Sequence, residues 1–264
     1  MKPIFSLLIP TRHRVPKLEI FLQTIAKNTK HYDAIEVLIM HDEDDIISEA
    51  YLFRCKKRFG FQIRVFKTQQ SEFLNRDYYN ILASRAVGEF RWLVGDDLII
   101  IKKDWDVFLV EKINEYFFTH KSRIIYIRIK DDTPKPEDHL PDYANFPMMS
   151  KEAIKTVGFF MPPEIPSWSG DYLVYLIYNH NKSNRILTIE EPILNHICSL
   201  TRVEPDIITI ETNTTSRMRS IHAKYKIGEL VPIWIAETLP HYRGKLKHFL
   251  DTYKRKINEP IQFF

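Results

Sequence analysis

Glycine is scarce in this chain of 264 residues, which contains only 7 of them. No glycine fingerprint for dinucleotides follows the first apolar stretch, and no glycine- and lysine-containing loop of the kind that cradles phosphates occurs. A dinucleotide-binding dehydrogenase and a P-loop nucleoside triphosphatase are therefore both disfavoured.

Cysteine and long apolar runs are also rare. The two cysteines, Cys55 and Cys198, lack metal or redox spacing and are predicted to be buried thiols rather than a disulfide. The apolar stretch Ile4–Ile9 near the N-terminus is stopped by a proline and then by Arg12 and Arg14. This pattern predicts neither a signal peptide nor a transmembrane segment, so we expect a cytoplasmic location.

Charge is unevenly distributed along the chain. Residues 1–200 hold 27 Lys and Arg against 27 Asp and Glu, whereas residues 201–264 hold 11 against 7. A basic tail can attract anionic lipid, nucleic acid or a phosphorylated acceptor, but an excess this small is more typical of a solvated helix face. We therefore expect no nucleic acid partner and at most a weak peripheral contact with a membrane.

The first hundred residues alternate between strand and helix patterns with short connections. Strands are predicted at 4–9, 35–40, 61–66 and 90–94, and helices at 16–30, 45–59 and 73–87. This alternation predicts an α/β fold with a doubly wound, mostly parallel sheet flanked by helices. The length fits one large domain, predicted at 1–200, followed by a linker and a C-terminal helical appendage at 201–264, with helices near 220–227, 231–238 and 245–257.

An apolar strand runs directly into two adjacent carboxylates, Asp96 and Asp97. Two acids at a rigid strand end repel each other unless a cation or hydrogen-bond donors compensate them. The pair is either a divalent-metal site or a polar turn that ends the strand. Polar residues also follow the first strand, as Thr11 and Arg12, and the second, from Asp42 onward, and ligands of such sheets bind beyond these carboxyl ends.

The chain resembles the GT-A-fold nucleotide-sugar glycosyltransferases, in particular the inverting type found among spore-coat polysaccharide enzymes. The resemblance covers about residues 4 to 198, and five segments carry it. They are Ser6-Leu-Leu-Ile-Pro-Thr-Arg12, Glu36-Val-Leu-Ile-Met-His-Asp42, the segment from Asn80 to Ala86-Val-Gly-Glu-Phe90, Gly95-Asp-Asp-Leu98 and Ser169-Gly-Asp171. The chain departs from the family where Gly95 stands at the first position of the expected Asp-X-Asp motif.

The resemblance implies a bound divalent metal, Mn²⁺ or Mg²⁺, and a nucleoside-diphosphate sugar donor of the UDP or GDP type. Asp97 is the expected metal ligand, and Asp96 would bind ribose or a metal-bound water. His196, at the end of a short predicted strand, is either a further metal ligand or a structural histidine.

Five other residues are expected around the donor. Thr11 and Arg12 would lie at the nucleoside, and Asp42 would either bind base or ribose or cap the helix that begins near residue 45. Arg76 either faces the diphosphate or is an exposed surface arginine, and Trp168 would form an apolar wall for the sugar ring.

Asp171 stands at the start of a predicted apolar helix. It is either the helix N-cap or the general base that deprotonates the acceptor hydroxyl. Attack from the face opposite the diphosphate would invert the anomeric configuration.

The expected function is thus metal-dependent, inverting transfer of a sugar to a hydroxyl acceptor, which could be a glycan, a lipid-linked molecule or a protein. A catalytically silent domain that binds nucleotide sugars or glycans is one alternative. A nucleotidyltransferase on a related fold is another, although the segment after the first strand lacks the glycines that such an enzyme needs.

Overall fold

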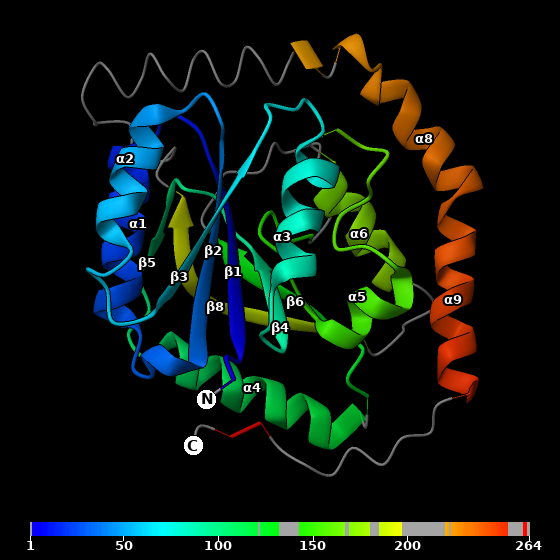
Figure 1. The fold of residues 1–264 in the computed structure, drawn as a ribbon. Coiled ribbons are helices and arrows are strands. Elements are labelled where there is room, and N and C mark those ends of the chain that lie inside the picture. The colour runs from blue at the N-terminus through cyan, green and yellow to red at the C-terminus, as the bar shows by residue number, and fades with distance from the viewer. Residues whose placement is uncertain are drawn as a thin grey trace.

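The computed structural model describes residues 2–120, 122–131, 143–166, 169–179, 185–196, 220–221, 223–252 and 261–262. These residues form an eight-stranded sheet in the order β3-β2-β1-β4-β7-β6-β8-β5, with helices on both faces (Figure 1). Four of the seven pairings between neighbouring strands are parallel, and three are antiparallel. The predicted α/β class with a mostly parallel, doubly wound sheet is confirmed.

The parallel half of the sheet contains the strands that the sequence predicted. They are β1 (Phe5–Thr11), β2 (Ile35–Asp42), β3 (Gln62–Thr68) and β4 (Phe90–Leu93). Strand β1 lies between β2 and β4 and is parallel to both, with Leu8 opposite Leu38 on one side and opposite Leu93 on the other. The carboxyl ends of β1, β2 and β4 therefore meet at one edge of the sheet.

The helices between these strands differ from prediction mainly in their ends. They are α1 (Val15–Asn28), a short 3₁₀ helix η1 (Tyr32–Ala34), α2 (Ile46–Cys55), a π-helical turn η2 (Asn75–Tyr79) and α3 (Asn80–Arg85). Helix α2 ends earlier than the predicted residue 59. The single helix predicted at 73–87 begins as a π-helical turn, a distortion that often occurs at functional sites.

The second half of the chain completes the sheet. Its elements are β5 (Leu98–Ile100), α4 (Trp105–His120), β6 (Tyr126–Asp131), β7 (Met148–Ser150), α5 (Lys151–Val157), α6 (Gly170–Tyr178) and β8 (Ile186–His196). Strand β8 contains Pro192, which has no N–H to donate to a neighbouring strand. The pairing of β6 with β8 shifts register between the pairs Ile129–Ile189 and Asp131–Leu194, and this irregularity accommodates the proline.

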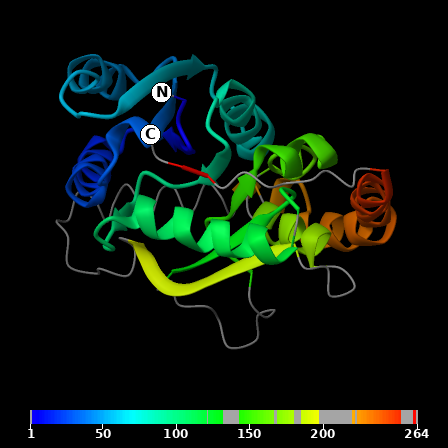
Figure 2. The same cartoon turned by 90° about the horizontal axis from the view of Figure 1, so that it is seen from below.

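The predicted helical appendage is present as α8 (Ile227–Glu237) and α9 (Leu239–Thr252). The predicted ends of these helices were wrong. We expected a new helix to begin near residue 231, but α8 begins at Ile227 and continues through Pro232. Both helices lie beside α5 and α6 (Figures 1 and 2), and Trp234, Leu239 and Leu246 are buried in the same core cluster as α6. The domain boundary at residue 200 lies outside the described residues and stays a prediction.

The core has two parts, one on each face of the sheet. Alternate residues of β1 separate them, because Phe5, Leu7 and Ile9 face α1, α2 and α4, whereas Leu8 faces α3, α5 and α6. Burial on both faces explains why β1 and β2 are mostly apolar, whereas the edge strand β3 is only partly buried and contains charged residues. Among the described helices, none is both long and apolar enough to cross a membrane. Cys55 is a buried free thiol as predicted, and Cys198 lies outside the described residues.

The buried carboxylate of Glu36 on β2 forms hydrogen bonds with the neighbouring strands β1 and β3. Glu36 on β2 is fully buried and accepts hydrogen bonds from Ser6 Oγ at 2.6 Å, from Arg64 Nη1 at 3.0 Å and from the backbone N–H groups of Val87 at 2.7 Å and Gly88 at 3.1 Å. Burial alone would raise the pKa of Glu36, but these donors outweigh it and hold the pKa below its usual value.

We expect Glu36→Gln to lower the free energy of unfolding at pH 7 by about 3 kcal/mol, because an amide cannot satisfy all of these donors. A lowered folded-state pKa gives stability that is present above the unfolded-state pKa and is lost as the pH falls. Urea denaturation should therefore show the difference from wild type at pH 7 and a smaller difference near pH 3. The exposed Glu190→Gln is the control, and an equal effect of both substitutions would contradict the assignment.

Candidate active site

Asp96 and Asp97 lie in the turn between β4 and β5, and both are buried, with 2% and 8% of their surface exposed. Thr11, the last residue of β1, donates a hydrogen bond from Oγ1 to Asp96 Oδ2 at 2.7 Å. The parallel pairing of β1 with β4 brings these side chains together across 85 residues of sequence.

The glycine before the acid pair has a steric role. A Cβ atom added at Gly95 would lie 2.5 Å from Asp97 Oδ1, which is far inside van der Waals contact. The absence of a side chain at this position therefore lets the Asp97 carboxylate fold back over the backbone of the turn.

Arg14, which the sequence analysis did not select, bridges the two acids. It lies between β1 and α1, and its guanidinium contacts Asp96 Oδ1 through Nη1 at 2.8 Å and Asp97 Oδ2 through Nη2 at 2.5 Å. The signal that could have revealed it is its place just after a strand whose carboxyl end borders the acid pair. In the sequence, Arg14 is noticeable only as one of two arginines that follow the apolar stretch Ile4–Ile9.

His196 reaches the acid pair from the far side of the sheet. It is the last residue of β8 and pairs with Leu98 at the start of β5, which places it next to the turn that carries the acids. Its Nε2 lies 3.2 Å from Asp97 Oδ2, and its ring packs edge-on against Phe146 with 5.5 Å between ring centroids.

The two acids have different electrostatic surroundings. Burial raises the pKa of Asp96 to about 6, and although Arg14 opposes this shift, the charge of Asp97 adds to it. Burial would also raise the pKa of Asp97, but the hydrogen bond from His196 and the charge of Arg14 outweigh it and place this pKa well below its usual range. Asp97 therefore has the lower pKa of the two acids.

A second charged cluster lies at the end of the neighbouring strand β2. Asp42 is 2% exposed and accepts hydrogen bonds from Arg12 Nη1 at 2.5 Å and from the hydroxyl of Tyr78. Arg12 also binds both carboxylate oxygens of Asp44, at 2.6 and 2.8 Å. The capping alternative for Asp42 was wrong, because the N-cap of α2 is Asp45, which accepts from the backbone N–H of Ser48 at 3.0 Å.

Asp171 lies in the first turn of α6 but does not cap it. The N-cap is Ser169, and the Asp171 carboxylate accepts a hydrogen bond from the backbone N–H of Tyr172 at 2.9 Å. Burial raises the pKa of the Tyr79 hydroxyl, and the negative charges of Asp97, Asp96 and Asp171 raise it further. The charges of all three carboxylates therefore act on the same buried phenol.

The remaining two predicted residues are Arg76 and Trp168. Arg76 is about half exposed and pairs with Asp77, with Nε 2.8 Å from Oδ1, and it stacks over the ring of Phe73 at 4.2 Å. Its surroundings match the alternative of a surface arginine. Trp168 lies outside the described residues, so its role stays a prediction.

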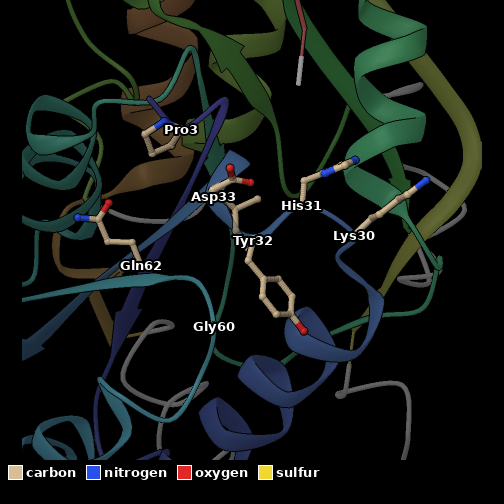
Figure 3. Close-up of a pocket in the computed structure, with 8 residues that line it drawn as sticks. Pro3, Lys30, His31, Tyr32, Asp33, Gly60 and Gln62 are labelled. Carbon is tan, nitrogen blue, oxygen red and sulfur yellow. The ribbon is translucent and has the colours of Figure 1, made fainter. Parts of the chain in front are cut away.

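The structure also contains a hollow of about 490 Å³ lined by Lys30, His31, Tyr32, Gly60 and neighbouring residues (Figure 3). Its lining includes the first residues of β2 and β3, Ile35 and Gln62. It therefore lies at the amino ends of the parallel strands, whereas the acid pair lies at their carboxyl ends.

Few side chains of the types that bind metal ions are grouped together in the described part of the chain. Within the described ranges, no group of three or more His, Cys, Asp or Glu side chains is arranged to hold a metal ion. Asp97 and His196 are nevertheless adjacent. Mg²⁺ and related ions in nucleotide sites are commonly held by one or two protein side chains together with phosphates and water, so the donor set fits a cation that binds together with a diphosphate.

No protein-family model matches this sequence, and no curated protein matches it. Solved structures do match it. TarS 1–349 of S. aureus in complex with UDP-GlcNAc has a TM-score of 0.55 at 18% identity, covering 94% of this chain and 71% of that one. The mannosyltransferase PcManGT of Pyrobaculum calidifontis, in complex with GDP-Man and Mn²⁺, has a TM-score of 0.53 at 12% identity, covering 96% of this chain and 75% of that one.

The chain has the GT-A fold. At these identities the likeness shows the fold alone. The match to another structure of TarS 1–349 spans 60% of that chain, and the match to the longer TarS chain spans 43% of it. In this GT-A chain, the acid pair and Asp42 lie beyond the carboxyl ends of parallel strands, where open α/β sheets bind their ligands.

Proposed function

We propose that this GT-A chain is a glycosyltransferase that moves a sugar from a nucleoside-diphosphate sugar to a hydroxyl acceptor. The observation that carries the proposal is the buried acid pair Asp96–Asp97 at the carboxyl end of β4, with Thr11 and His196 bound to it from two other strands. TarS binds UDP-GlcNAc and PcManGT binds GDP-Man, which supports a donor of the UDP or GDP type.

Asp97 and His196 are the residues that would hold a divalent cation, Mn²⁺ or Mg²⁺. Asp97 has the lower pKa of the two acids, and carboxylate and imidazole are both ligands that Mn²⁺ accepts. When bound, the cation would stabilise the negative charge that develops on the departing diphosphate. The structure of PcManGT contains Mn²⁺, which supports this assignment.

The cluster at the end of β2 would bind the nucleoside. Asp42 is held by Arg12 and Tyr78, so its carboxylate is fixed in position and can accept hydrogen bonds from a base or from ribose hydroxyls. Asp96, held by Thr11, is the second candidate for contact with ribose. Arg76 has no part in this proposal, because its guanidinium pairs with Asp77 at the surface.

Asp171 is the proposed general base. It stands in the first turn of α6, whose N-cap is Ser169, and its charge acts on the Tyr79 hydroxyl together with the charges of the acid pair. A carboxylate there would take the proton of the acceptor hydroxyl as that oxygen attacks the anomeric carbon. If the attack comes from the face opposite the diphosphate, the reaction inverts the anomeric configuration.

A panel of nucleoside-diphosphate sugars tests the proposal through thermal stability with and without Mn²⁺. A donor at about 100 times its Kd should stabilise the fold by about 2.7 kcal/mol and raise Tm by about 5 to 10 °C. Slow release of free sugar or a transfer product, followed by mass spectrometry, would separate an enzyme from a silent binding domain. If no nucleotide sugar stabilises the protein, the proposed function fails while the GT-A fold stands.

A further inference from the structure

Arg14 occupies the position in which the two acids of the candidate site need a positive charge. Its two terminal nitrogens each contact a different carboxylate, Asp96 at 2.8 Å and Asp97 at 2.5 Å. Only 15% of the Arg14 side chain is exposed, and the side chains of the acids are exposed by 2% and 12%. Two adjacent buried carboxylates without a cation would be strongly destabilising, so Arg14 supplies the compensation that the protein needs before any ligand binds.

The contact on Asp97 is also the one that a metal would need. Arg14 Nη2 and His196 Nε2 both lie against the same atom, Asp97 Oδ2. A divalent cation held by Asp97 and His196 would compete with the guanidinium for that oxygen. Arg14 and the metal are therefore alternative partners of Asp97.

A displaced Arg14 would remain close to the ligand. It lies at the N-terminal end of α1, directly after the segment that contains Thr11 and Arg12. A guanidinium is a planar group with several donors and binds phosphate through paired hydrogen bonds. A donor diphosphate beside the acid pair would therefore offer Arg14 new acceptors.

We infer that Arg14 is the resident counter-cation of the acid pair, which a divalent metal must displace from Asp97 and which then binds the diphosphate of the donor. This inference rests on the proposed function for the identity of the ligand. It makes metal and nucleotide binding interdependent. The metal alone binds weakly because it must displace an ion pair, whereas metal and diphosphate together give every charged group a partner.

The substitution Arg14→Gln separates the two roles, because it should move two affinities in opposite directions. Without nucleotide, Mn²⁺ binding measured from the electron paramagnetic resonance signal of free Mn²⁺ should tighten by about tenfold or more, since the competing cation is gone. At saturating Mn²⁺, the affinity for UDP or GDP measured by calorimetry should fall by about tenfold or more. Arg14→Lys, which keeps the charge but loses the planar fork, should lie between wild type and Arg14→Gln in both measurements.

The matched control is Arg58→Gln, because Arg58 is an exposed arginine paired with Glu19, and this change should alter neither affinity. Unchanged or weaker Mn²⁺ binding by folded Arg14→Gln would overturn the inference and leave Arg14 as a structural ion-pair partner. If Arg14→Gln does not fold, the same opposite shifts are required of Arg14→Lys. A wild-type protein that binds neither UDP nor GDP defeats the proposed function, whereas the Mn²⁺ measurement still decides whether Arg14 competes with the metal.

Discussion

Replacing Asp171 with asparagine is expected to slow sugar transfer by about 100-fold or more while donor affinity stays within a few-fold of wild type. Asparagine has nearly the same shape, and its carbonyl oxygen can still accept the hydrogen bond that Tyr172 donates to Asp171. It cannot take up a proton from the acceptor hydroxyl. The substitution therefore removes the chemistry and keeps the local structure.

The measurement that decides this prediction is single-turnover transfer together with Tm on the same protein. Because Ser169, not Asp171, is the N-cap of α6, the change in Tm should be small. Asp33→Asn is the matched control, since Asp33 lines the hollow at the opposite end of the sheet (Figure 3) and should leave transfer unchanged. Transfer at full speed by well-folded Asp171→Asn would remove this residue from the mechanism, and with it the main argument for inversion.

The substitution Asp97→Asn is expected to weaken Mn²⁺-dependent binding of UDP or GDP by about 10- to 100-fold, the factor that corresponds to one lost charge-assisted interaction. The neutral amide would also lose the ion pair with Arg14 and weaken the contact with His196 Nε2. Asp96→Asn should have a smaller effect, because the proposed role of Asp96 is contact with ribose and not with the metal.

Calorimetry with each nucleoside diphosphate, in Mn²⁺ and in chelator, tests the assignment of Asp97. Wild type should show a large difference between the two conditions, and Asp97→Asn a much smaller one. Binding by wild type that is equally strong in chelator would show that the acid pair is not a metal site. Tm measurements on both variants would distinguish a lost ligand from a damaged fold.

The sequence predicted the parallel half of the sheet because the signals there are local. Strands β1, β2 and β4 are mostly apolar, β3 carries Ile63, Val65 and Phe66 among polar residues, and the connecting segments show helical spacing or end at glycine. The rule that ligands bind beyond the carboxyl ends of parallel strands then selected Thr11, Asp42 and the acid pair without a structure. The structure does bring Thr11 to Asp96, at 2.7 Å.

Some signals in the sequence had two local interpretations. Asp42 and Asp171 each precede or begin a helix, so both also matched an N-cap, and the structure gives those caps to Asp45 and Ser169. Arg76 was selected for its position in sequence, but the turn of η2 places it beside Asp77 at the surface. Spacing along the chain does not specify which side of this helical turn faces the site, where Tyr78 of the same turn donates a hydrogen bond to Asp42.

The sequence by itself determined the fold class, the parallel strands and the acids at their ends, because apolar periodicity and the direction of a strand are properties of neighbouring residues. Only the tertiary structure decided the partners of the acid pair. Arg14 contacts it because β1 pairs with β4, and His196 contacts it because β8 pairs with β5 and aligns His196 with Leu98, next to Asp97. Pairings between strands so far apart in sequence depend on how the whole sheet buries its two faces, and no local pattern records them.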